Sequence, residues 1–276
     1  MIKVDGKVVN IEYFPDGTPR INLNPDDVEE QRYDGVNYIL IKWFYEKNDE
    51  LFYLMLIKKH LERHFTNVNY ELFMPYIPNG RMDRIKHDDE VFTLKHFCDF
   101  INYLNFDSVF VLDAHSDVSV ALLNNCSNES PKEYIEKAIN HIESYEDSDL
   151  ILFFPDSGAS KRYSSILPEY KYVYGNKVRT WETGEIVGLE IVNPFNVDLK
   201  DKAILIVDDI CSKGTTFAKS AEALSKYEVK NIYLWITHCE NTIFKGEVPT
   251  KDLIKKVFTT NSIFTEECEK VEVLEL

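Results

Sequence analysis

The chain has 276 residues, of which 44% are hydrophobic and 28% charged, a composition that argues against an intrinsically disordered protein. Its formal net charge of -16 argues against nucleic acid and membranes as partners, because an acidic surface repels both at long range. The five cysteines form no CxxC pair, and the N-terminal sequence MIKVDGKVVN lacks the apolar core of a signal peptide. We therefore expect reduced thiols in a cytoplasmic protein.

The first half of the chain contains three candidate strands and one candidate helix. The stretches 36–45 and 51–58 are rich in aromatic and β-favouring residues and are separated by the polar sequence EKNDE. Together they predict a β-hairpin. Apolar residues at helical spacing predict a helix over 88–104, and the sequence SVFVL predicts a strand over 108–112.

The second half alternates between helices and strands. Ser130, Pro131 and Glu133 form a capping-box pattern, which predicts that a helix begins there with Ser130 as its N-cap. The remaining predicted elements are strands at 149–154, 203–207 and 231–236 and a helix around 216–226.

This alternation predicts an α/β fold with two tandem wound, mainly parallel sheets, because short strands that are apolar on both faces are typical of buried parallel sheets. The polar stretch 124–131 is the expected boundary between the two halves. We therefore predict an N-terminal domain over 1–130 and a C-terminal domain over 131–276.

Ionisable residues follow four of the predicted strands. They are Asp113 and His115 after SVFVL, Asp156 after LILFF, Asp208 and Asp209 after AILIV, and His238 after IYLWI. The carboxyl ends of parallel strands form the ligand crevice of wound α/β sheets, so these groups are candidates for a site. An aspartate at such a position also serves as a helix cap or turn residue, and His238 is expected to be structural.

The sequence DDICSKGTT at 208–216 combines two kinds of binding group. Asp208 and Asp209 can accept hydrogen bonds from a vicinal diol. The following loop offers hydroxyls, backbone amides and one cation just before a helix, which is typical of a phosphate site; its residues are Ser212, Lys213, Gly214, Thr215 and Thr216. A site that binds a vicinal diol beside a phosphate fits ribose 5-phosphate.

This loop resembles the phosphoribosyl-diphosphate loop of the type I phosphoribosyltransferase fold. Further segments resemble the ribose-phosphate diphosphokinases, also called phosphoribosyl-diphosphate synthetases, and lie in the order of that family. They are YFPDGTPRI at 13–21, MPYIPNGRMDR at 74–84, LDAHSDVS at 112–119, FFPDSGASKR at 153–162 and GNKVRTWETGEI at 175–186.

The resemblance implies transfer of pyrophosphate from ATP to the anomeric hydroxyl of ribose 5-phosphate, with release of AMP. It implies that Lys177 and Arg179 are catalytic cations that embrace the transferring phosphates; an ordinary solvated loop is the competing interpretation. The residues that it implies for ATP binding are Phe14, Asp16, Arg81, Asp83, Arg84 and His115. Lys161 and Arg162 add local positive charge or pair structurally.

Magnesium is the cofactor that the resemblance implies, together with ATP as co-substrate. Asp156 and His115 are the implied metal-binding residues, and Asp156 suits magnesium better because this ion favours oxygen ligands. The resemblance also implies a homo-oligomer, because sites of this family take the segment that contains Phe14 from a neighbouring subunit.

Three alternatives remain open at this stage. The same chemistry could use ADP-ribose as the acceptor, the protein could be a phosphoribosyltransferase that acts on a base, or it could be an inactive regulatory partner. Thr18 and Met82 stand where the family usually has glutamate and glutamine, and Lys213 adds a cation to a loop that is often uncharged there. These departures bear on the acceptor and on regulation more than on the class of reaction.

Overall fold

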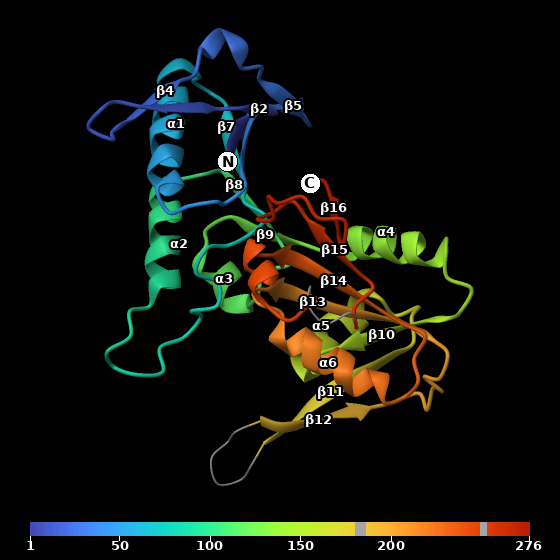
Figure 1. The fold of residues 1–276 in the computed structure, drawn as a ribbon. Coiled ribbons are helices and arrows are strands. Elements are labelled where there is room, and N and C mark those ends of the chain that lie inside the picture. The colour runs from blue at the N-terminus through green and yellow to red at the C-terminus, as the bar shows by residue number, and fades with distance from the viewer. Residues whose placement is uncertain (180–185, 249–252) are drawn as a thin grey trace. The chain divides into compact units, whose positions relative to one another are not determined.

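The computed structural model describes residues 1–179, 186–248 and 253–276, excluding the side chains of 177–179 and 186–188. The described chain forms two compact units, Met1–Glu129 and Ser130–Leu276. Each unit contains one seven-stranded, mainly parallel sheet, so the predicted fold class is confirmed (Figure 1). In the described ranges, no helix is both long and apolar enough to cross a membrane.

The sheet of the N-terminal unit has the strand order β2-β1-β6-β7-β8-β9, and β5 pairs with β6. The strands β6 to β9 are parallel, whereas β1, β2 and β5 join the sheet in antiparallel pairs. The bounds are β1 Ile2–Val4, β2 Lys7–Val8, β5 Gln31–Tyr33, β6 Val36–Trp43, β7 Asn69–Phe73, β8 Ser108–Leu112 and β9 Cys126–Glu129.

Three helices and a separate hairpin complete this unit. The helices are α1 Glu50–His64, α2 Thr93–Tyr103 and α3 Asp117–Leu122, with a short 3₁₀ helix at Pro25–Asp27. Figure 1 shows α1 and α2 on the same side of the sheet. The hairpin consists of β3 Asn10–Tyr13 and β4 Pro19–Asn22, which pair only with each other among the described strands.

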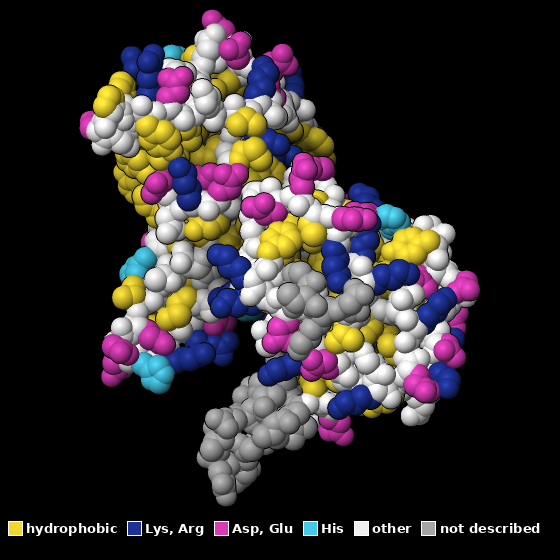
Figure 2. Space-filling view, in the orientation of Figure 1, with side chains coloured by type: hydrophobic (Ala, Val, Ile, Leu, Met, Phe, Trp, Pro, Cys, Tyr) yellow, Lys and Arg dark blue, Asp and Glu magenta, His cyan; other side chains and the backbone are white. Residues whose placement is uncertain are grey.

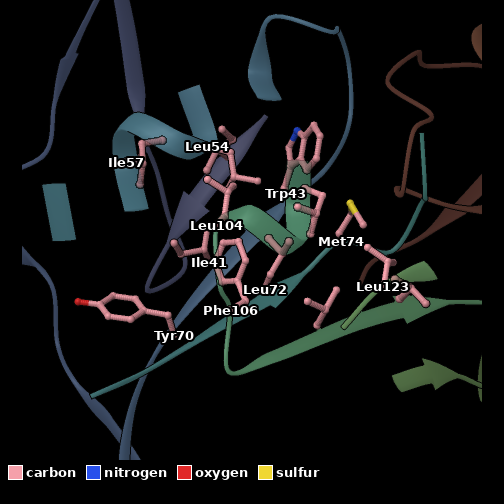
Figure 3. Packing of buried hydrophobic residues seen from close by; sticks show 14 of the residues in the cluster. Ile41, Trp43, Leu54, Ile57, Tyr70, Leu72, Met74, Leu104, Phe106 and Leu123 are labelled. Carbon is pink, nitrogen blue, oxygen red and sulfur yellow. The ribbon is translucent and has the colours of Figure 1, made fainter. Parts of the chain in front are cut away.

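The core of the N-terminal unit joins α1 and α2 to the sheet. Leu54 and Ile57 of α1 pack with Ile41 and Leu72 of the central strands and with Trp43 (Figure 3). All five side chains are at most 1% exposed. Helices α1 and α2 each bury one face against this sheet.

The C-terminal unit has the strand order β12-β11-β10-β13-β14-β15-β16, which places β13 at the centre. Neighbouring strands are parallel except for the β11–β12 pair. The bounds are β10 Leu150–Phe154, β11 Tyr172–Arg179, β12 Ile186–Val192, β13 Ala203–Cys211, β14 Asn231–Cys239, β15 Lys256–Thr260 and β16 Val271–Leu274. The helices are α4 Lys132–Glu143, α5 Ser157–Ile166 and α6 Thr215–Ser225, with a 3₁₀ helix, η2, at Asn241–Lys245.

Helices cover both faces of this sheet. Phe217 and Leu224 of α6 pack with Ile204 and Ile206 of β13 on one face. On the other face, α4 and α5 pack with alternate residues of the same strand, such as Leu205. Burial on both faces explains why β10, β13 and β14 are continuous apolar runs in the sequence.

The predicted hairpin over 36–45 and 51–58 is wrong in its second half. Residues 36–43 form β6, but 51–58 belong to α1. The buried positions of α1 include Tyr53, Leu54 and Ile57, a spacing that puts them on one helical face. The many aromatic and β-favouring residues concealed this spacing in the sequence.

Several predicted boundaries also differ from the structure. The helix expected over 88–104 begins at Thr93, and the N-cap of α4 is Pro131 instead of Ser130. The strands β13 and β14 continue to Cys211 and Cys239. Asp208, Asp209 and His238 therefore lie among the last residues of their strands and not after them.

Large hydrophobic side chains are exposed on the N-terminal unit (Figure 2). Within the first 52 residues, those more than a third exposed are Val8, Tyr13, Phe14, Tyr33, Val36 and Phe52. Exposed apolar surface is a common feature of protein–protein contacts.

Candidate active site

The last residues of the central strand β13 carry two neighbouring carboxylates. Asp209 is buried, and its Oδ2 accepts a hydrogen bond from Arg162 Nη1 of α5 at 3.2 Å. Its Oδ1 accepts from the backbone N–H of Ile210 at 2.8 Å. The half-buried Asp208 accepts from the N–H of Asp209 at 3.0 Å. The structure therefore holds one carboxylate in an ion pair and places the other beside it.

Burial raises the pKa of Asp208 well above its ordinary value, and the negative charge of Asp209 raises it further. The charge of Asp156 acts in the same direction, which places Asp156 within electrostatic reach of the pair. Carboxylates that repel one another in this way bind cations or hydroxyl donors favourably, because either relieves the repulsion. The end of β13 is therefore suited to a polar ligand.

Asp156 begins α5 and acts as its N-cap. Its Oδ1 accepts from the N–H groups of Gly158 and Ala159 at 3.0 and 3.1 Å. This capping role is the structural alternative that the sequence left open, and it coexists with the electrostatic contact to Asp208. Lys161, one turn into α5, is exposed, whereas Arg162 points to Asp209.

The loop after β13 turns through a glycine with positive φ directly before α6. Gly214 is the N-cap of α6 with φ +72°, and a Cβ at this position would lie 2.5 Å from Val248 Cγ2. Gly214 has no side chain with which to cap α6, so the N-cap residue makes no side-chain hydrogen bond to the first amides of the helix. Lys213, Thr215 and Thr216 are exposed, as groups that contact a ligand should be.

Lys177 and Arg179 lie on β11, at the edge pair of the sheet. In the backbone register, Lys177 is opposite Leu189 and Arg179 is opposite Ile186 of β12. Their side chains lie outside the described residues, as does the rest of the predicted catalytic segment up to 185. A Cβ on Gly175 would lie 2.7 Å from the carbonyl oxygen of Pro155, so this strand approaches the residue before Asp156 closely.

In the N-terminal unit, the structure brings together Asp83, Arg84 and His115. Arg84 Nε donates to Asp83 Oδ1 at 2.8 Å, and this hydrogen bond lowers the pKa of Asp83. The charge of His115 and a hydrogen bond from Ser116 act in the same direction, so both residues face Asp83. A Cβ on Gly80 would lie 3.9 Å from the Cβ of His115. The segments after β7 and β8 therefore meet.

Arg81 is exposed in the same segment. Phe14 and Asp16 lie elsewhere in the unit, at the tip of the β3–β4 hairpin. Phe14 is 49% exposed, and hydrogen bonds from the N–H and hydroxyl of Thr18 lower the pKa of Asp16. Phe14 therefore faces solvent and is not part of a hydrophobic core.

Within the described ranges, no group of three or more histidine, cysteine or acidic residues is arranged to hold a metal ion. Asp156 and His115, the two residues expected at a metal, belong to different units. Magnesium retains water and binds through one or two carboxylates together with substrate phosphates. The carboxylates near the end of β13 fit that preference, whereas the nitrogen of His115 does not.

Sequence reasoning missed two residues of these clusters. Ser116 contacts Asp83, and Glu240 accepts a hydrogen bond from the loop residue Ser212 at 2.7 Å. Glu240 directly follows β14. The signal that identified the other candidates, a polar group after an apolar strand, could also have identified Glu240.

Comparison with known proteins places the chain in a family. Residues 128–275 match the family described as "Phosphoribosyl transferase domain". The ribose-phosphate pyrophosphokinase of Thermococcus kodakarensis is 27% identical over 235 residues, which cover 83% of this chain and 77% of the relative. The enzyme of the same name from Pyrococcus furiosus is 26% identical over 241 residues, which cover 86% of this chain and 80% of the relative.

The fold is also similar to a solved structure along nearly the whole chain. The crystal structure of phosphoribosylpyrophosphate synthetase from Mycobacterium smegmatis matches with a TM-score of 0.73 at 19% identity. The match covers 97% of this chain and 86% of that chain. Both units therefore have counterparts in one protein of known fold.

Proposed function

The chain belongs to the phosphoribosyl transferase domain family, and from this premise we propose that it is a ribose-phosphate pyrophosphokinase. In this reaction the anomeric hydroxyl oxygen of ribose 5-phosphate attacks the β-phosphorus of ATP. The bond from that phosphorus to the oxygen bridging it to the α-phosphate breaks, AMP leaves with the oxygen, and the hydroxyl proton is released.

The juxtaposition of paired carboxylates and an anion loop at the end of β13 carries this proposal. Asp208 and Asp209 accept hydrogen bonds from the ribose hydroxyls, while residues 212–216 hold the 5-phosphate against the N-terminus of α6. Arg162 orients Asp209 through the hydrogen bond that it donates to Oδ2. The positive φ of Gly214 lets the backbone approach the phosphate closely.

Positive side chains supply the charge that phosphoryl-type transfer requires. Such transfer depends mainly on positioning the reactants and stabilising negative charge on the phosphate oxygens. We assign this role to Lys177 and Arg179. Arginine remains charged and can bind two oxygens at once, and lysine adds a point charge.

The ATP is assigned to the segments after β7 and β8, through Arg81, Asp83, Arg84 and His115. The close pairing of Asp83 with Arg84 and His115 supports this assignment, because it places a guanidinium and an imidazole side by side on a protein with a net charge of -16. Phe14 and Asp16 are assigned to the ATP of a neighbouring copy.

Magnesium, when bound with ATP, neutralises charge on the phosphates. The oxygen ligands that it prefers are present at Asp156 and Asp208. The negative charges of Asp209 and Asp156 both act on Asp208, and a cation beside these carboxylates would offset their repulsion. The assignment of His115 to the metal rests on sequence resemblance alone, and its ring nitrogen is a better partner for phosphate.

A homo-oligomer is the assembly that this assignment requires. The exposed apolar surface of the N-terminal unit and the exposed side chain of Phe14 support it. Light scattering on the purified protein should therefore give a mass that is a multiple of 32.3 kDa. A monomer at assay concentrations would contradict the assignment of Phe14.

The deciding experiment is incubation with ATP, magnesium and ribose 5-phosphate, followed by mass spectrometry of the products. We expect AMP and phosphoribosyl diphosphate without any base present. AMP formed only with ADP-ribose would change the acceptor and retain the chemistry. Pyrophosphate release that depends on a base, without AMP, would identify a phosphoribosyltransferase, and ATP binding without turnover would identify an inactive partner.

A further inference from the structure

Glu240 lies beside the first residue of the phosphate loop because β13 and β14 end in register. Cys211 and Cys239 are paired in the parallel sheet, and the N–H of Glu240 donates to the carbonyl oxygen of Cys211 at 2.8 Å. The half-buried Glu240 then accepts from Ser212 Oγ through Oε1 at 2.7 Å. Its Oε2 accepts from the hydroxyl of Thr242 at 2.9 Å.

The segment that carries Glu240 is packed tightly against the loop. A Cβ on Gly246 would lie 1.7 Å from the carbonyl oxygen of Lys213, and a Cβ on Gly214 would lie 2.5 Å from Val248. These distances show that the two segments lie in direct contact at Gly246 and at Gly214. The contact holds Glu240 beside Ser212 in the structure.

This arrangement has a chemical consequence for phosphate binding. A serine hydroxyl has one proton to donate, and in the structure the hydroxyl of Ser212 donates to Glu240. An incoming phosphate offers only acceptor oxygens at neutral pH, so it needs the same proton. The carboxylate and the phosphate are also both negatively charged and repel each other across a short distance.

We propose that Glu240 sets how tightly the loop binds phosphate, because its carboxylate competes with the substrate phosphate for the Ser212 proton. It thereby lowers the affinity of the loop for phosphate, and it disfavours a doubly charged phosphate more than a singly charged one. The inference rests on the proposed function, since it takes 212–216 as the site of the 5-phosphate. Because that phosphate is not the reacting group, Glu240 affects ground state and transition state alike, and the effect appears in KM and not in kcat.

The test compares binding of ribose 5-phosphate to the wild type and to Glu240→Gln by calorimetry. Glutamine keeps the size and one acceptor oxygen but removes the charge. We expect Kd to fall about threefold to tenfold, the range of a modest charge interaction. Added salt should shrink this gain, because it screens the repulsion in the wild type. A merely structural role would produce neither the tighter binding nor its salt dependence.

Further variants test the opposite change in Kd and the dependence of the effect on Ser212. Thr242→Val removes a donor to Glu240, which leaves the carboxylate a stronger acceptor for Ser212, so Kd should rise. In a Ser212→Ala background, Glu240→Gln should lose most of its effect. The control is Glu269→Gln, which removes one exposed charge from the same unit outside the loop and should leave Kd unchanged.

The outcomes separate this inference from the proposed function. If the wild type binds ribose 5-phosphate but Glu240→Gln binds it equally or more weakly, the inference is overturned. If the wild type does not bind ribose 5-phosphate, or binds it with an affinity that Ser212→Ala and Gly214→Ala leave unaltered, the phosphate loop itself is wrong. Should Glu240→Gln fail to fold by circular dichroism, the rise in Kd of Thr242→Val decides, and an unchanged or lower Kd overturns the inference.

Discussion

Arg162 of α5 and Asp209 of β13 form an ion pair at 3.2 Å between Nη1 and Oδ2, although they lie 47 residues apart. The side chain of Asp209 is 7% exposed and that of Arg162 is 33% exposed. The pair links the helix that begins at Asp156 to the central strand. It therefore couples two parts of the proposed ribose site.

Replacing Arg162 with alanine should both destabilise the protein and weaken ribose binding. Because the replacement removes a charged partner from a buried carboxylate, we expect the free energy of unfolding to fall by about 1–3 kcal/mol, with allowance for the exposure of the arginine. Urea denaturation measures this change, and the KM for ribose 5-phosphate should rise. Lys161→Ala, at an exposed neighbouring position, is the control and should change neither quantity.

Replacing Asp208 with asparagine should change how stability depends on pH. The pKa of Asp208 is raised by burial and by Asp209, so at intermediate pH the folded state binds more protons at this group than the unfolded state. Its contribution to stability is therefore lost as pH rises from the unfolded pKa, about 3.9, through the folded pKa. Asp208→Asn should unfold at higher urea concentration than the wild type at pH 8, and the difference should vanish near pH 4. A difference that is independent of pH would contradict the raised pKa.

Gly214→Ala tests whether the loop conformation is required. Its φ of +72° costs a residue with a side chain about 1 kcal/mol, and the new Cβ would also collide with Val248. We expect a loss of stability above 1 kcal/mol and at least a tenfold weaker binding of ribose 5-phosphate. Gly17→Ala is the matched comparison, because φ is +82° there and nothing lies within 4 Å of the added atom. Equal losses for the two variants would show that the packing at 214 is unimportant.

The assigned catalytic cations can be tested singly. Lys177→Ala and Arg179→Ala should each lower kcat about a hundredfold or more, as expected for loss of a donor that stabilises the transition state. Lys171→Ala, an exposed lysine just before the same strand, should leave kcat within about twofold. Near-normal turnover of both Lys177→Ala and Arg179→Ala would remove them from the mechanism.

Three strands of the C-terminal unit and the loop at 212–216 could be predicted from the sequence. The strands β10, β13 and β14 are buried on both faces, so local composition is enough to identify them. The loop is likewise local, because a glycine with positive φ and small hydroxyl residues lie together in the chain. Its assignment to ribose phosphate stays a prediction.

Helix α1 shows where local patterns were insufficient. Residues 51–58 contain so many apolar side chains that neither alternation nor helical spacing stands out. Only packing on the sheet selects Leu54, Ile57 and Leu61 as the buried set, which has the spacing of a helix. Intrinsic preference for strands was overridden by this tertiary burial.

The sequence by itself determined the chemical groups of this protein and the strands that carry them, because both depend on residues close together in the chain. Only the tertiary structure decided which groups meet. Because β10 pairs with β13, the helix that follows β10 brings Arg162 to Asp209. The register of β13 with β14 places Glu240 at Ser212, 28 residues away. Such contacts depend on how segments far apart in the chain pack together, and a local sequence pattern does not specify that packing.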